Sequence, residues 1–321
     1  MKSTRYVIGM DGGGTKTVAI IAALDGTIIA EHVAGPTNFQ FIGVEKAAQT
    51  IYSLICDCCN SAGCTVREIS AVTLGLAGAG RTGDQKRMAD GLRAYAVSQG
   101  TRLKEVIVDS DARIALEGAF KGGPGIIVIA GTGSIAFGKD RHGVIHRVGG
   151  WGRILGDEGS GFFIGRAGLT AVTRYIDGRG EKTSLTKLVA EKFCLSDQTE
   201  IITAVYQSAF DVASIAPLVL EAAMKNDQVS RLIVEQASTD LTNHVRALGM
   251  KITPPSRRKV REKIPVSLIG GLIANDTLLR RMLLAQMELA LPHVQVTEPL
   301  SVPAYGAVVM SIAALDASAQ G

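Results

Sequence analysis

The sequence predicts an α/β protein made of two similar domains, with a helical insertion in the second. One observation is a glycine-rich segment, DGGGT at 11–15, that lies between two strand-like apolar stretches. A second such segment, GTGS at 131–134, follows about 119 residues later in the same setting. Strands and helix-periodic stretches alternate between them, which is typical of α/β domains. Two copies of one hairpin, each opening half of the chain, indicate a duplicated domain.

Composition indicates a globular protein. The chain has 321 residues and is 46% apolar, enough for a large core and about two domains. Its 34 basic and 30 acidic residues nearly balance and only 5% of it is aromatic, so we expect no nucleic-acid partner. No apolar run approaches the roughly 18 residues of a membrane span, and no signal-peptide pattern follows Met1. We therefore expect a cytoplasmic protein without a membrane partner.

The first domain is expected to cover residues 1–112. RYVIGM, KTVAIIAAL and TIIAEHV predict three strands, and Asp25-Gly26 between the last two is typical of a hairpin turn. VEKAAQTIYSLI has helical apolar periodicity and Gly63 is expected to end that helix. ISAVTLGLAGAG and KEVIVDSD then predict two more strands, the first ending in a glycine loop.

The second domain is expected to cover residues 113–302. GIIVIA, IAFGK and VIHRV repeat the three-strand pattern, and 159–250 is almost wholly helix-periodic, which indicates an insertion. IPVSLIGG and VQVTEP predict strands on either side of a helix capped by Asn275. The basic run SRRKVREK at 256–263 is expected to be a solvated loop. We expect the last helix, 303–321, to pack on the first domain.

The two glycine segments differ from the common phosphate loops. A P-loop or a dinucleotide fingerprint stands between a strand and a helix, whereas these glycines stand between two strands. Positive φ angles and missing side chains would let backbone N–H groups converge on an anion. Two such loops that face each other across a cleft could hold the two ends of a triphosphate.

Five segments in this order carry a family resemblance: DGGGTKT at 11–17, SDA at 110–112, AGTGSIAFG at 130–138, GGWGRILGDEGSG at 149–161 and IGGLIAN at 269–275. Together they resemble the N-acetylglucosamine kinase branch of the BadF/BadG/BcrA/BcrD-type ATPase family, in the actin and sugar-kinase superfamily. The resemblance spans the chain, and GGWG-x3-GDEGS is its most particular part. It implies two RNase H-like ATPase domains around a nucleotide and sugar cleft, and a homodimer.

The implied activity is transfer of phosphate from ATP to the 6-hydroxyl of an amino sugar. The small-molecule partner would be N-acetylglucosamine, glucosamine or N-acetylmuramate. The resemblance implies ATP-binding residues in three segments: Gly12, Gly13, Gly14, Thr15 and Lys16; Thr132 and Gly133; Gly270, Gly271 and Asn275. Asp11 would hold Mg²⁺ through its waters. Lys16 on a strand could instead point to solvent, Asp11 could merely cap the turn, and the Gly270-Gly271 pair could serve packing.

The resemblance points to Asp111 as the catalytic base that takes the hydroxyl proton. Phosphoryl transfer depends mainly on positioning and on neutralisation of charge. One carboxylate that accepts the hydroxyl proton is therefore enough. A purely structural alternative is that Asp111 is an N-cap of the helix that it opens. Asp109 stands two residues earlier on the same expected strand face, so it stays open which of the two is the base.

Sugar recognition is expected from polar groups that match the hydroxyls of the substrate. The implied residues are Asn38, Ser134, Trp151, Gly152 and Asp157. Glu158 is a neighbour of the expected acceptor Asp157, and Trp151 could form a pocket wall or be a core aromatic. Ile135 occupies a position that is polar in some relatives, which keeps all three sugars open.

Two other classes of protein share the nucleotide fold. The first is the ATPase activator of a 2-hydroxyacyl-CoA dehydratase, which needs a bridging iron–sulfur cluster held by cysteines, whereas residues 65–193 contain none. Four of the five cysteines lie in one helical stretch, Cys56, Cys58, Cys59 and Cys64, and are expected to be reduced thiols. The second class is a sugar-responsive repressor, which needs a DNA-binding module that we do not expect before the first strand.

Overall fold

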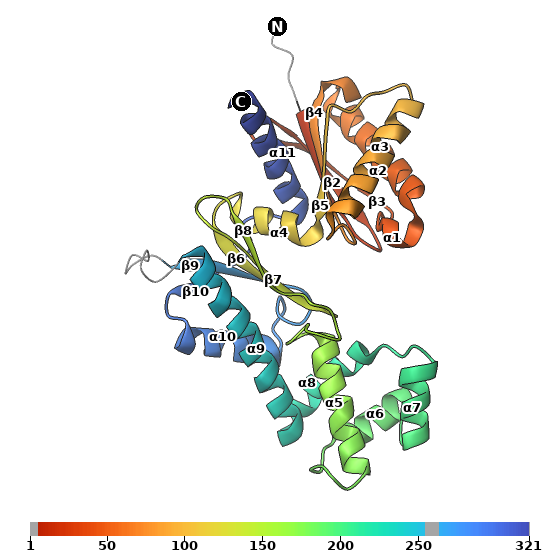
Figure 1. Cartoon of the computed structure of the whole chain (residues 1–321), viewed down its shortest axis with the longest axis vertical. Coiled ribbons are helices and arrows are strands. Elements are labelled where there is room, and N and C mark those ends of the chain that lie inside the picture. Colours follow the sequence, from red (N-terminus) through yellow and green to blue (C-terminus); the bar gives the residue numbers. More distant parts are fainter. Residues whose placement is uncertain (1–5, 254–262, 321) are drawn as a thin grey trace. The chain divides into compact units, whose positions relative to one another are not determined.

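The computed structural model describes residues 6–253 and 263–320. The chain divides into two compact units, which are Met1–Gly123 with Glu298–Gly321 and Pro124–Thr297 (Figure 1). The predicted loop at 256–263 lies, except for Lys263, outside the described residues. No helix within the described ranges is both long enough and apolar enough to cross a membrane.

The first unit is built on a five-stranded sheet of order β3-β2-β1-β4-β5. Its strands are β1 (Tyr6–Gly12), β2 (Thr17–Ala23), β3 (Ile28–Ala34), β4 (Ile69–Leu76) and β5 (Glu105–Ser110). Strands β1, β2 and β3 are antiparallel, while β4 runs parallel to β1 and β5 parallel to β4. The carboxyl ends of β1, β4 and β5 therefore meet at one edge of the sheet, where Asp11 pairs with Gly75 and Gly75 with Asp109.

The second unit repeats this sheet. Its strands are β6 (Gly125–Ala130), β7 (Ser134–Lys139), β8 (Ile145–Gly149), β9 (Ile264–Ile269) and β10 (Val294–Val296), in the order β10-β9-β6-β7-β8. The hairpin β6-β7-β8 is antiparallel, β9 is parallel to β6, and β10 is parallel to β9. The two sheets have the same topology, so the predicted fold of two duplicated α/β domains is confirmed.

Helices cover both faces of the first sheet. They are α1 (Phe39–Ile42), α2 (Val44–Ala62), α3 (Thr82–Ser98), α4 (Asp111–Phe120) and α11 (Pro303–Gln320). Helices α2 and α3 lie on one face and α11 on the other (Figure 1). The predicted end of α2 is correct, since Gly63 adopts a φ of 63° and its amide donates to the carbonyls of Asn60 and Cys59.

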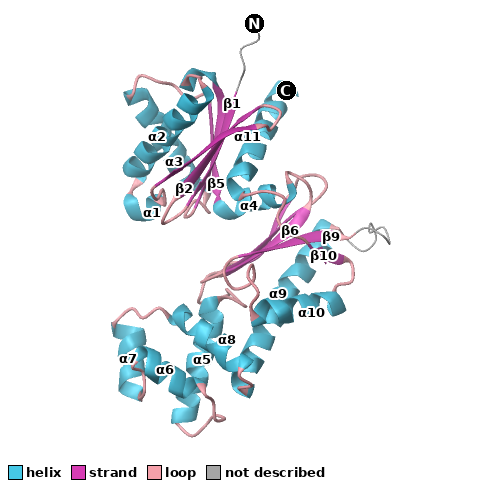
Figure 2. Cartoon of the chain, turned by 180° about the vertical axis from the view of Figure 1, so that it is seen from behind, coloured by secondary structure: helices cyan, strands magenta, loops and turns pink. Residues whose placement is uncertain are grey.

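The C-terminal helix α11 packs against β1, β4 and α4 (Figure 2). Glycine allows the closest approach, because a Cβ on Gly306 would collide with the Ile114 carbonyl of α4. The hydroxyls of Thr73 and Ser311 form a buried hydrogen bond of 2.7 Å between β4 and α11. These contacts keep α4 in the first unit, whose first segment ends at Gly123, whereas we expected the boundary at residue 112.

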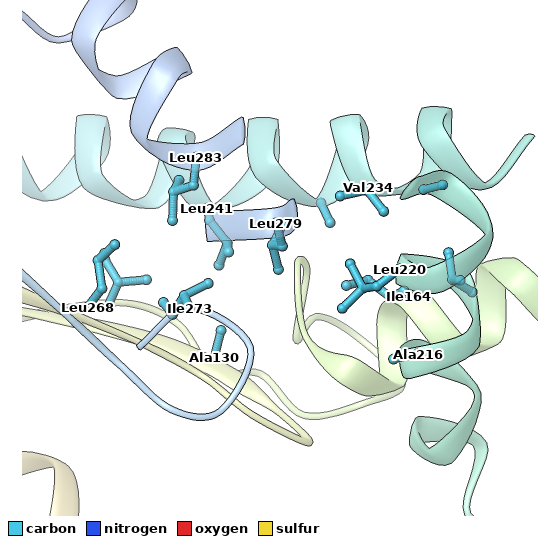
Figure 3. Close-up of a cluster of buried hydrophobic side chains, with 14 of the residues drawn as sticks. Ala130, Ile164, Ala216, Leu220, Val234, Leu241, Leu268, Ile273, Leu279 and Leu283 are labelled. Carbon is cyan, nitrogen blue, oxygen red and sulfur yellow. The ribbon is translucent and has the colours of Figure 1, made fainter. Parts of the chain in front are cut away.

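The long connection between β8 and β9 is helical. It contains α5 (Gly161–Ile176), α6 (Leu185–Phe193), α7 (Gln198–Gln207), α8 (Ala216–Met224) and α9 (Gln228–Ile252), and α10 (Leu278–Ala290) follows β9. Helix α9 packs on β6, β7 and β8 and also on α10. Figure 3 shows the resulting core, in which Leu241 of α9 lies near Leu279 and Leu283 of α10. The insertion thereby shares one core with the sheet that carries the second glycine loop.

Candidate active site

The first glycine loop joins β1 to β2. The amide of Gly13 donates to the carbonyl of Lys16 at 3.0 Å and closes the turn. The amides of Gly14 and Thr15 have no acceptor among the described residues, and both residues are exposed. Consecutive free N–H groups of this kind suit an anion.

The second glycine loop joins β6 to β7 and is closed in the same way. The amide of Gly131 donates to the carbonyl of Gly133 at 2.9 Å. Within the ranges that the structure describes, the amides of Thr132 and Gly133 are likewise left without an acceptor. Each unit thus presents a pair of free amides at the carboxyl end of its first strand.

The expected backbone conformation of these glycines is wrong. No positive φ occurs at Gly12, Gly13 or Gly14, nor at Gly131 or Gly133. The need for glycine is steric at two of these positions. A Cβ on Gly12 would collide with the Thr37 hydroxyl, and one on Gly133 would lie 3.2 Å from Oδ2 of Asp157.

One residue after each loop anchors it to a later segment. Thr17 begins β2 and donates its hydroxyl to the Gly35 carbonyl at 2.8 Å, while Ser134 begins β7 and donates to the Glu158 carbonyl at 2.6 Å. Ser134 therefore corresponds to Thr17, and not to Thr15, which the spacing of about 119 residues between the two segments would match with it. Its hydroxyl is buried and is already engaged within the protein.

The same later segments also donate to the loops. In the first unit, the amides of Thr37 and Asn38 donate to the Gly13 carbonyl at 3.1 and 3.2 Å. In the second unit, the amide of Gly161 donates to the Gly131 carbonyl at 2.8 Å. The GPTN and GDEGSG segments thus hold equivalent places in the two repeats. Asn38 lies beside the first glycine loop and caps α1, its Oδ1 accepting from the Gln40 amide.

Two predicted acids come together in the first unit. Burial, with a further contribution from the charge of Asp111, raises the pKa of Asp11 to about 6, while Lys16 opposes the shift. Asp111 is the exposed first residue of α4. The purely structural reading of Asp111 as the N-cap is wrong, because the cap is Ser110, whose Oγ accepts from the Arg113 amide at 3.2 Å.

Asp109 has a different environment from Asp111. Burial raises the pKa of Asp109, and the charged groups that act on it are Arg113 and Glu117 of α4. Those two side chains form an ion pair in which Glu117 is buried. The charge of Asp111 thus acts on Asp11, whereas the charges that act on Asp109 are those of Arg113 and Glu117.

Sequence reasoning assigned no role to the loop that follows β4. The Ala77 amide donates to the Gly12 carbonyl at 2.9 Å, and the side-chain amide of Gln40 donates to the Gly78 carbonyl at 3.2 Å. A Cβ on Gly78 would lie 3.1 Å from Oδ1 of Asn38. The signal that could have located this loop is AGAG at the end of a buried strand.

The segment after β9 lies beside the second glycine loop. Gly270 has a φ of 98°, and a Cβ there would collide with the Ala130 carbonyl at the end of β6. Gly271 has no atom near its Cβ position. Asn275 does not cap the following helix as predicted. Helix α10 begins at Leu278 and is capped by Thr277, and the Asn275 side chain instead donates to the Gly271 carbonyl at 3.5 Å.

The GGWGRIL segment forms an exposed turn. The carbonyl of Gly152 accepts from the amides of Leu155 and Gly156 at 3.2 and 2.8 Å. Trp151 is 72% exposed, so the reading of it as a core aromatic is wrong. The guanidinium of Arg147 lies 5.9 Å from its ring centroid. Arg147 thus lies over one face of the indole, while most of the side chain remains exposed.

Asp157 lies next to the second glycine loop. It has a φ of 58°, and its carboxylate faces the Cα of Gly133. The structure thus brings Thr132, Gly133, Asp157 and Gly270 together in the second unit. In the first unit it brings together Asp11, the 12–16 loop, Asn38 and Asp111.

The donor set of the first unit fits a magnesium ion. Mg²⁺ keeps several waters and takes one or two carboxylates. The raised pKa of Asp11 reflects partial burial next to Asp111, a negative environment that a divalent cation would favour. Among the residues that the structure covers, no three His, Cys, Asp or Glu side chains form a dedicated metal cluster.

Burial raises the pKa of Cys58 to about 12, which keeps that thiol protonated.

Two α/β units of one topology, each with a loop of free amides after its first strand, define the fold of the actin-like sugar kinases. Within that class the chain belongs to the BadF/BadG/BcrA/BcrD ATPase family, whose profile matches residues 8–311.

Proteins of known name share most of the chain. It is 34% identical over 310 residues to the N-acetylmuramic acid/N-acetylglucosamine kinase of Clostridium acetobutylicum, covering 96% of this chain and 98% of that protein. It is 29% identical over 322 residues to the N-acetyl-D-glucosamine kinase of Dictyostelium discoideum, covering 97% and 98%. A crystal structure from Chromobacterium violaceum, provisionally named an N-acetylglucosamine kinase, matches with a TM-score of 0.69 at 29% identity and covers 96% of this chain and 99% of that one.

Proposed function

We propose that this protein is an ATP-dependent amino-sugar kinase that phosphorylates the 6-hydroxyl of N-acetylglucosamine, N-acetylmuramate or glucosamine. The observation that carries the proposal is the pairing of Asp11 with Asp111 beside a glycine loop and Asn38. Full-length similarity to kinases named for N-acetylmuramic acid and N-acetylglucosamine supports the choice of substrate class.

The nucleotide is proposed to bind through main-chain groups. In the first unit, the free amides of Gly14 and Thr15 would donate to phosphate oxygens, and Lys16 would add positive charge. In the second unit, Thr132 and Gly133 would do the same. Gly270 and Gly271 would let the nucleoside lie against main chain, with Asn275 holding that turn.

Mg²⁺ would be held by Asp11 through water molecules and would neutralise phosphate charge. Asp111 would accept the proton of the sugar hydroxyl as the bond from the hydroxyl oxygen to the γ-phosphorus forms and the bond to the bridging oxygen breaks, with ADP as the leaving group. Asp111 is the exposed first residue of α4, so its carboxyl group is accessible to a substrate. A single base is enough, because the transition state is loose and the proton leaves late.

The sugar is proposed to contact Asn38 in the first unit and Trp151, Gly152 and Asp157 in the second. Asn38 and Asp157 can bond ring hydroxyls, and the exposed indole of Trp151 can cover an apolar sugar face. Ser134 would contribute indirectly, because its hydroxyl supports the Glu158 carbonyl next to Asp157. We further propose that the protein is cytoplasmic and that it forms a homodimer. Sedimentation of the pure protein would test the homodimer.

A coupled assay of ADP release tests the proposal. The protein would be supplied with ATP, Mg²⁺ and, in turn, each of the three amino sugars, with glucose as a matched control that lacks the amino group. We expect turnover with at least one amino sugar, a 6-phosphate product by NMR, and weaker turnover with glucose. Absence of sugar-dependent ADP release with all three would refute the proposed activity.

A further inference from the structure

Helix α9 of the insertion supports both ends of the loop between β8 and α5. At one end, a Cβ on Gly149 would lie 3.0 Å from Cε1 of His244. At the other end, a Cβ on Gly159 would lie 2.5 Å from Cγ of Leu241. Both glycines have positive φ, 72° and 78°. The loop that holds Trp151 and Asp157 is therefore seated on one face of α9.

His244 is buried and lies next to Glu158 of this loop. Its Nε2 is 3.8 Å from Oε2 of Glu158. Both Nδ1 of His244 and Oε2 of Glu158 are buried and have no hydrogen-bond partner within the described part of the chain. Asp240, one turn earlier on α9, adds its charge to the pair: burial lowers the pKa of His244, and Glu158 and Asp240 oppose that shift.

Two unpartnered polar atoms on neighbouring side chains are unusual in a protein interior. A buried polar atom that stays unbonded loses its hydration without compensation. Such groups call for an explanation, and a role in a neighbouring site is one of them. A movement of about 1 Å would bring Nε2 of His244 to hydrogen-bond distance from Oε2 of Glu158.

We propose that His244 is a positioning residue for the sugar-binding loop and acts through Glu158. Ser134 holds the main chain of Glu158 by a hydrogen bond to its carbonyl, and His244 lies 3.8 Å from its carboxylate. Asp157 is the adjacent residue, so a Glu158 held in place would limit the positions open to Asp157. The inference rests on the proposed kinase function. It adds a residue of the insertion that is not among the residues proposed to bind ATP or the amino sugar.

The principal variants are His244→Leu, which removes both ring nitrogens, and His244→Gln, which keeps a polar amide. Arg246→Ala is the matched control, since Arg246 lies on the same helix and is exposed. We expect His244→Leu to raise KM for the amino sugar at least tenfold and to change KM for ATP less than twofold. His244→Gln should recover much of the loss, and Arg246→Ala should resemble the wild type.

A double variant tests whether the effect passes through Glu158. If it does, Glu158→Gln with His244→Leu should be no worse than the more affected single variant. The proposal would be overturned if the effects of the two single variants multiplied in the double variant. It would also be overturned if a folded His244→Leu protein showed equal increases in KM for sugar and for ATP, or an unchanged KM for sugar.

Trp151 supplies a readout that needs no turnover. It is the single tryptophan of the chain, so its fluorescence anisotropy reports on the loop. We expect lower anisotropy in His244→Leu and Glu158→Gln than in the wild type and in Arg246→Ala. Wild-type protein that phosphorylates no amino sugar would refute the proposed function alone, whereas unchanged anisotropy in both variants would refute the positioning role alone.

Discussion

Burial and the charge of Asp111 together raise the pKa of Asp11 to about 6, although the two residues lie far apart in the sequence. Asp11 is the penultimate residue of β1 and Asp111 is the first residue of α4, and the parallel arrangement of β1, β4 and β5 brings these positions to one sheet edge. In the proposed function, Asp11 would hold the cation and Asp111 would accept the proton.

Asp111→Asn should lower kcat by about 10²–10⁴-fold, the usual contribution of a general base. KM for sugar and for ATP should stay within about threefold, because the amide keeps the size of the side chain. Steady-state ADP release measures both constants. Asp109→Asn is the control, and it should lose far less activity because the charges that act on Asp109 are those of Arg113 and Glu117 and not that of Asp11. A larger loss in Asp109→Asn would reverse the assignment of the base.

Asp11→Asn should make the ligand-free protein more stable at neutral pH. The pKa of Asp11 rises from 3.8 to about 6 on folding, so the ionised carboxylate disfavours the folded state. The variant should gain up to about 3 kcal/mol above about pH 6, and the gain should fall to zero below about pH 4, where the acid is protonated in both states. Urea unfolding across this pH range with EDTA present measures the difference. A variant less stable than the wild type at pH 7 would contradict the expected sign.

The glycines of the first loop should differ in their tolerance of a methyl group. Gly12→Ala should cost about 2 kcal/mol or more in the free energy of unfolding, because its Cβ would collide with Thr37. Gly14→Ala should stay within about 0.5 kcal/mol, since no atom lies within 4 Å of its Cβ position.

The same pair of variants separates structure from binding. Gly14→Ala should still raise KM for ATP about tenfold if phosphate approaches the free amides there. Calorimetric unfolding and ATP kinetics on both variants provide the test. Normal ATP kinetics in Gly14→Ala would argue against phosphate at this loop.

The cysteines should not assemble an iron–sulfur cluster. Burial raises the pKa of both Cys58 and Cys59, so a metal would first have to displace their protons. Protein purified without oxygen and incubated with iron and sulfide should stay colourless and should contain no stoichiometric iron. A brown, iron-loaded protein would favour the dehydratase-activator class instead.

Local pattern was sufficient for some elements and failed at others for identifiable reasons. Gly63 ends α2 as predicted, because its φ is a property of the turn itself. The sequence predicts Asn275 as the cap of α10, whereas Thr277 caps it in the structure. Both residue types favour caps and they stand two positions apart, but the Asn275 side chain bonds the Gly271 carbonyl instead. The exposure of Trp151 could not be read from the sequence either, because an aromatic among glycines suits a core and a ligand surface equally.

By itself, the sequence determined the duplication, the order of the strands along the chain and the glycine segments that mark the carboxyl end of each first strand. These follow from periodicity and turn chemistry, which act over a few residues. The tertiary structure decided which acids act on each other, that α4 belongs with the first unit, and that His244 supports the GGWGRILGDEGSG loop. Those relationships join residues far apart in the chain, and they depend on strand pairing and helix packing that no local pattern encodes.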